Sequence, residues 1–73
     1  MIYQICEFEI TQHDCWKVTL NKEGNKSYIE YNNGDGWKIS ETIDDDEAKI
    51  VYMQIVSLMI DGMYIDLDQF GIF

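Results

Sequence analysis

The stretch ETIDDDE, residues 41–47, carries five carboxylates in seven positions and is the densest acidic stretch of the chain. Carboxylates at such spacing can start a helix, bind a cation or face a basic partner. Aspartate is a strong N-cap, and an acid three residues later completes a capping box. Asp44 and Glu47 have this spacing, which predicts that they begin a helix. Successive helical residues point in different directions, so three acids are left to contact a partner: Glu41, Asp45 and Asp46.

Two kinds of metal site compete with this interpretation. Calcium loops need acids, a glycine and a final glutamate in one fixed register, and no register of residues 32–47 provides all of them. Cys6, His13 and Cys15 could supply three zinc ligands, but the paired C-x2-C spacing of structural zinc sites is missing. The sequence therefore favours neither a bound metal nor another cofactor.

A catalytic role has little support in the residue types. A thiol nucleophile would require Cys6 or Cys15 beside His13, yet nothing nearby marks an oxyanion hole. The stretch NGDG, residues 33–36, lacks both the spacing and the lysine of a phosphate-binding loop. A domain of 73 residues also leaves little volume for a catalytic pocket. The chain is expected to be non-catalytic. In a reducing cytosol free thiols are favoured over a disulfide for the two cysteines, and a Cys6–Cys15 bridge stays open as the alternative if the two lie on paired neighbouring strands.

The charge of the chain narrows the class of partner. Fourteen acidic residues against five lysines give a net charge of −9. Nucleic acid and anionic membranes attract Lys and Arg, so both are disfavoured as direct partners. The favoured partner is a basic protein, such as one that itself handles nucleic acid. The alternative is that the charge serves solubility alone.

The expected location is the cytoplasm. No run of about 18 apolar residues is present to span a bilayer. The first ten residues, MIYQICEFEI, lack the basic segment that begins a signal peptide.

Alternation of apolar and polar residues predicts four strands, separated by polar turns such as KEGNK and NNGDG. Tyr3 and Ile5 are out of phase with the rest of the first strand, which predicts either a bulge or a two-sided strand there. In the last strand Trp37 and Ile39 are expected to face inward. The four strands are expected over residues 2–10, 15–21, 27–32 and 37–40.

Residues 44–61 change to a helical period and end at Gly62, a residue typical of the position that follows a helix. One apolar stripe is suited to packing on the sheet, and it comprises Ala48, Val51, Tyr52, Ile55, Leu58 and Met59. A second apolar patch must be covered by the tail or by another molecule, which makes it a candidate dimer face: Ile50, Met53, Val56 and Ile60. The apolar tail, residues 63–73, is expected to fold back as an edge strand or as a helical turn around DLDQF.

These elements predict one α+β domain over residues 1–73. Its antiparallel sheet of three to four strands forms a meander, because each strand is joined to the next by a short turn, and it packs against one α-helix.

This layout resembles a known group of proteins. A short meander with the turn NNGDG, then KISETIDDDE leading into a single apolar helix, is similar to the small acidic anti-CRISPR proteins of phages that inhibit the type II CRISPR nuclease. The likeness covers about residues 16–62. It implies a phage-encoded inhibitor that occupies the DNA-binding, PAM-reading cleft of the nuclease by DNA mimicry, in a host cytosol. By this resemblance the partner-binding acids are Asp35, Glu41, Asp44, Asp45, Asp46, Asp66 and Asp68.

Two other function classes remain open. One is an immunity or antitoxin-like protein that blocks a basic toxin or nuclease through the same electrostatics. The other is a homodimeric accessory protein whose apolar helix face buries against a second copy.

Overall fold

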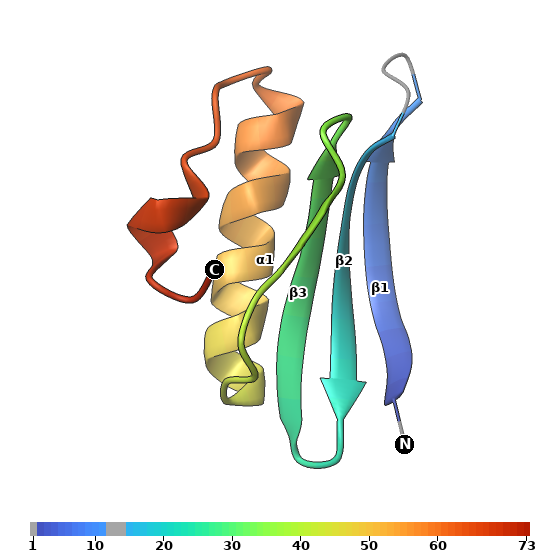
Figure 1. Cartoon of the computed structure of the whole chain (residues 1–73), viewed down its shortest axis with the longest axis vertical. Helices are drawn as coiled ribbons and strands as arrows, with labels where there is room; N and C mark the ends of the chain where they lie inside the picture. Colours follow the sequence, from blue (N-terminus) through green and yellow to red (C-terminus); the bar gives the residue numbers. More distant parts are fainter. Residues whose placement is uncertain (1, 12–14) are drawn as a thin grey trace.

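The computed structural model describes residues 2–11 and 15–73 and has the predicted α+β architecture. Four strands form one antiparallel sheet in the order β1-β2-β3-β4, a meander in which each strand pairs with its neighbour in sequence. One α-helix packs on this sheet, chiefly on β2 and β3, and the C-terminal segment follows it (Figure 1). The elements are β1 (Ile2–Ile10), β2 (Trp16–Glu23), β3 (Lys26–Asn33), β4 (Trp37–Ile39), α1 (Asp45–Ile60) and the 3-10 turn η1 (Leu67–Phe70).

The register of the sheet follows the alternation of the sequence. β2 pairs with β3 along its whole length, from Trp16 opposite Asn33 to Glu23 opposite Lys26. The two-residue connection begins with Gly24 at φ 65°, which meets the requirement of a tight hairpin for positive φ at its first central position. In β1 the register shifts between Gln4 and Cys6. The predicted bulge is therefore confirmed, and it lets both halves of β1 pair with β2.

Helix α1 begins and ends close to the predicted positions. Its N-cap is Asp44, and its last turn is closed by two backbone bonds, from Gly62 N–H to the Met59 carbonyl (3.0 Å) and from Met63 N–H to the Leu58 carbonyl (3.0 Å). Gly62 has φ 67°. This is a Schellman arrangement, and glycine adopts its left-handed conformation without a Cβ penalty.

The core lies between the inner face of the sheet and one stripe of α1. The buried helix residues are Ala48, Val51, Ile55 and Met59, which confirms the predicted stripe at i, i+3 and i+4 spacing. They pack against the inner residues of β2 and β3, which are Val18, Leu20, Ile29 and Tyr31.

The prediction that Trp37 and Ile39 face inward is wrong. Their side chains are 49% and 59% exposed. Trp37 lies opposite Asn32 and Ile39 opposite Glu30, so both belong to the sheet face that points away from α1. The alternation within β4 was correct, but its phase was not. Phase depends on the register with β3, which three residues after a glycine-containing turn do not reveal.

Beyond β4 the chain continues alongside β3 toward the start of α1. Ser40 N–H donates to the Ile29 carbonyl and the Ser40 hydroxyl accepts from Ile29 N–H, each at 2.8 Å. Ile43 and Ser27 then exchange two backbone bonds of 2.8 Å. These bonds bring the start of α1 beside the β2–β3 hairpin.

The C-terminal tail folds back, as predicted, and uses a helical turn rather than an edge strand. Ile65 and Ile72 are buried at its two ends, with η1 between them. The Ile72 carbonyl accepts the backbone N–H of Glu41 at 2.8 Å. The tail therefore closes the core on the side away from β1 (Figure 1).

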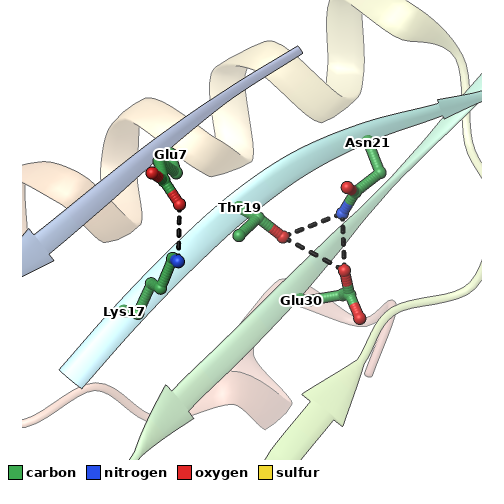
Figure 2. A network of polar contacts seen from close by, with 5 residues as sticks. All are labelled: Glu7, Lys17, Thr19, Asn21 and Glu30. Atoms are coloured by element: carbon green, nitrogen blue, oxygen red, sulfur yellow. Dashed lines mark hydrogen bonds and ion pairs between the residues drawn. The ribbon is translucent and has the colours of Figure 1, made fainter. Parts of the chain in front are cut away.

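The outer face of the sheet carries a polar network that occupies two acids. Figure 2 shows Asn21 donating through its amide to Thr19 Oγ1 (2.8 Å) and to Glu30 Oε1 (2.9 Å), while the Thr19 hydroxyl also donates to Glu30 (3.3 Å). Beside it Lys17 pairs with Glu7 at 2.6 Å. Among the described helices none is both long and apolar enough to cross a membrane.

Candidate acidic binding surface

The acids at the start of α1 are arranged differently from the predicted capping box. Asp44 is the N-cap residue, but its side chain caps no helical N–H. Its carboxylate instead pairs with Lys26 of the hairpin at 2.8 Å, and 77% of the side chain stays exposed. Because the chain enters α1 beside the hairpin, the lysine lies within reach and takes the place of the capping bond.

Asp45 is the best-anchored of the predicted partner residues, contrary to the expectation that it stays free. Its two oxygens accept bonds from Lys22 Nζ (2.6 Å) and the Ser27 hydroxyl (2.7 Å). The bond from Lys22, followed by that from Ser27, lowers the pKa of the Asp45 carboxyl. Asp45 therefore fastens the first turn of α1 to both strands of the hairpin. The sequence could not indicate this, because it joins residues 18 and 23 positions apart.

The anchored carboxylate predicts a specific loss of stability in acid. A folded-state pKa below the ordinary value of 3.8 means that the unfolded chain binds the proton more readily. The stabilisation is therefore complete above that value and is lost as the pH falls through the folded pKa. Urea midpoints measured from pH 6 to pH 2 should fall more steeply below about pH 4 for the natural chain than for Asp45→Asn. Equal slopes for the two chains would contradict the assignment.

Two further predicted residues beside α1 are free to meet a partner. Glu41 and Asp46 are exposed, and neither side chain accepts a hydrogen bond or ion pair from any described residue. We refer to Glu41, Asp44, Asp45 and Asp46 as the helix-start cluster. Asp46 and its neighbours also lie in the first turn, where the helix dipole stabilises negative charge.

The remaining predicted acids lie together elsewhere. Asp35, Asp66 and Asp68 line one groove of about 640 Å³ between β4 and the C-terminal segment. Asp66 also accepts the backbone N–H of Asp68 at 3.1 Å, which begins η1. We refer to these three as the groove acids. Their proximity follows from the fold-back of the tail, which the sequence suggested without indicating where it would lie.

Sequence reasoning missed the aromatic and basic side chains of this groove. Trp37 and Ile39 line it from β4, and Tyr64 lines it from the tail. Lys38 also contributes to the lining and has no ion pair within 4.0 Å among the described residues. The available signal is an aromatic residue immediately after a glycine turn, but the alternation of the last strand places Trp37 in the core.

Asp35 and the start of α1 lie far apart. The helix start is tied to the beginning of β3 through Ser27, whereas Asp35 follows the end of β3. Seven residue steps along that strand separate the two places by about 24 Å, and Figure 1 shows the start of α1 and the turn after β3 toward opposite ends of the long axis. The tail acids lie between them, since the Ile72 carbonyl accepts the Glu41 N–H and the Asp68 carbonyl accepts the Gly71 N–H. One strand of duplex DNA carries a phosphate every 3.4 Å or so, and the separation thus corresponds to about seven phosphates.

A separate apolar surface lies on α1. Ile50, Met53 and Ile60 are 59%, 68% and 64% exposed, and Val56 is half-buried. This is the predicted dimer face: no described element covers Ile50, Met53 or Ile60, whereas Val56 packs against the edge of the core. A hollow of about 250 Å³ between this face and β1 is lined by Phe8, Tyr52, Met53, Val56 and Ile60, among others.

The cysteines take no part in these surfaces. Both are free thiols, as expected: Cys6 is half-buried and Cys15 is exposed in a turn with φ 64°. Burial and then the Cys6 side chain raise the pKa of Tyr52. Residues 2–11 and 15–73 contain no group of three or more side chains placed to hold a metal ion. His13, which the zinc alternative requires, lies outside the described residues.

The chain was compared with protein-family models, with curated proteins and with solved structures, and no match was found in any of the three.

Proposed function

We propose that this protein is a non-catalytic acidic inhibitor that binds the basic, nucleic-acid-binding surface of another protein, such as a nuclease or a CRISPR effector. The proposed mode is DNA mimicry, in which carboxylates take the places of phosphates, and the proposed site of action is the cytosol of a host cell. The resemblance to small acidic anti-CRISPR proteins supports this choice of target. The chain itself supports the class of partner.

One observation carries the proposal. On a chain of net charge −9, four of the seven predicted partner carboxylates are exposed and accept no side-chain bond from the described residues: Asp35, Glu41, Asp46 and Asp68. A carboxylate without an internal partner can pair with an incoming Lys or Arg without first breaking a bond. Asp35 and the start of α1, about 24 Å apart, would contact two sections of a basic cleft, with the acids of the tail between them.

The test is capture of a partner from host lysate, followed by binding measurements with the purified partner. We expect a basic, nucleic-acid-binding protein whose affinity for the chain weakens as salt is raised. Replacing the four free acids by their amides, in Asp35→Asn, Glu41→Gln, Asp46→Asn and Asp68→Asn, should weaken binding by about tenfold or more, a loss of about 1.4 kcal/mol.

A matched control keeps the total charge equal. Glu9, Glu23, Glu47 and Asp61 are also exposed, and their four amide replacements change the net charge by the same amount. This control should retain most of the affinity. If both quadruple variants lost affinity equally, net charge rather than these carboxylates would determine binding, and the assigned residues would be wrong. If nucleic acid did not compete with the chain for its partner, DNA mimicry would be wrong.

A second candidate function rests on the exposed apolar face of α1. In a homodimeric accessory protein this face would bury against its copy, and the association would be insensitive to salt. Light scattering coupled to size exclusion should then give twice the 8.6 kDa of a single chain. Met53→Lys should return the mass to that of one chain, because it places a charge in the centre of the face. A single-chain mass at high concentration and high salt would exclude this candidate.

A further inference from the structure

The groove between β4 and the C-terminal segment combines two kinds of side chain that attract cations. Three carboxylates line it, from Asp35, Asp66 and Asp68, against the single ammonium group of Lys38. Two exposed aromatic residues also line it, Trp37 at 49% and Tyr64 at 87% exposed. Trp37 lies opposite Asn32 on the outer face of the sheet, whereas Tyr31 of the groove belongs to the inner face, so the ring of Tyr64 is the one available to the groove. The face of an aromatic ring is electron-rich and attracts a cation placed over it. Both features repel anions, so the groove is suited to a positively charged group.

The shape of the groove favours a side chain of a protein over a small free cation. Its volume of about 640 Å³ is far larger than one cationic group needs. It also adjoins a second hollow of about 310 Å³, with which it shares Tyr31, Asn33, Tyr64 and Ile65. The second hollow adds the apolar side chain of Met63. A cationic side chain in the groove therefore has room for the neighbouring residues of its own chain.

Arginine fits this lining better than lysine. A guanidinium group is planar, stacks on aromatic rings and donates two parallel hydrogen bonds to a carboxylate. An ammonium group is a more strongly hydrated point charge and does neither. The floor of the groove is apolar and well packed, since Tyr31 and Ile65 are 4% and 8% exposed, and such a floor suits the apolar stem of a long side chain.

We propose that this groove binds an arginine side chain of a partner protein, with the guanidinium group between the exposed ring of Tyr64 and the groove acids. This inference rests on the proposed function, in that the arginine belongs to the basic surface the chain is proposed to bind. It adds that the two acidic groups act differently. The groove holds one residue by shape, whereas the helix-start cluster supplies charge alone.

The test uses short capped peptides, Gly-Ser-X-Ser-Gly, in which X is arginine, lysine or citrulline. Citrulline has nearly the shape of arginine but no charge. Titration of the isotopically labelled protein, followed by NMR, should move the signals of Trp37 and Tyr64. We expect the arginine peptide to bind several-fold more tightly than the lysine peptide, and the citrulline peptide to cause no saturable shift. Equal binding of arginine and citrulline would overturn the proposal.

Four variants test the lining. Asp35→Asn with Asp68→Asn should weaken binding of the arginine peptide about tenfold at low salt, while Tyr64→Ala should weaken that binding about two- to fivefold through loss of the ring face. Lys38→Gln should strengthen binding of the arginine peptide, because this substitution removes a competing cation from the groove. The control pair Glu47→Gln with Asp61→Asn lies outside the groove and should change the affinity for the arginine peptide by less than twofold. If the control pair weakened binding as much as the groove pair, the groove would not be the site.

The peptide result and the partner result are independent. Selective arginine binding with no basic protein captured from lysate would overturn the proposed function and leave the groove as an arginine site. Capture of a basic protein whose affinity is unchanged by Asp35→Asn, Asp68→Asn and Tyr64→Ala would overturn the groove as an arginine site and leave the proposed function. Folding of each variant is checked by circular dichroism before binding is measured.

Discussion

Ile55→Ala should remove about 2–5 kcal/mol from the free energy of unfolding. Ile55 is fully buried in the middle of the α1 stripe that packs on the sheet. Truncation removes three carbons from a site that the rigid strands on one side and the helix backbone on the other prevent from collapsing. A domain of 73 residues has about 4–11 kcal/mol of stability in total, so the variant should be partly unfolded at 37 °C.

Urea unfolding followed by circular dichroism measures this loss, and the same helix supplies the control. Met53 also loses a long side chain in Met53→Ala, yet it is 68% exposed. The free energy of unfolding of the Met53→Ala variant should differ from that of the natural chain by no more than about 0.5 kcal/mol. A similar loss in both variants would mean that the exposed face of α1 is covered in solution, which would favour the homodimeric candidate.

Ending the chain at Gly71 should lower the free energy of unfolding by about 3 kcal/mol. The removal of residues 72–73 exposes the space filled by Ile72, whose burial is worth about 1.5–3 kcal/mol. It also removes the carbonyl that accepts the Glu41 N–H, and an unmade backbone bond adds to the loss. Thermal unfolding of the shortened chain should show a clearly lower midpoint, together with weaker binding at the groove, because Phe73 lines it.

Tyr64→Ala is the control for the tail. Tyr64 lies in the same segment but is 87% exposed. Its truncation should therefore leave the unfolding midpoint nearly unchanged but weaken binding of the arginine peptide. The opposite pattern, a stable chain without residues 72–73, would mean that the tail does not close the core.

The secondary structure was largely predictable because each element carries its own local signal. Strand β2 alternates Val18 and Leu20 with Thr19, and α1 repeats apolar residues at helical spacing up to Gly62. Such patterns record the burial of one face. Alternation predicts the inward-facing side chains correctly where one face of a strand is covered by the main core. It fails for β4, because alternation alone does not show which face of an edge strand is covered.

The candidate surface was only partly predictable, for a related reason. The positions of acidic residues can be read from the sequence. Whether a carboxylate has an ion-pair partner depends on which lysine the fold brings beside it. Asp45 was expected to be free and is held by Lys22 and Ser27, whereas Asp44 was expected to cap the helix and is paired with Lys26. These contacts arise only when the chain returns beside the hairpin.

By itself the sequence determined the composition-driven properties of this protein: a strongly acidic α+β domain with one helix on a meander. Those properties depend on residue types and on neighbours a few positions apart. The tertiary structure decided the division of the acids into a helix-start cluster and a groove, and the exposure of Trp37 on the outer face of the sheet. Both depend on the pairing of β4 with β3 and on the return of the tail, which bring together residues far apart in the chain.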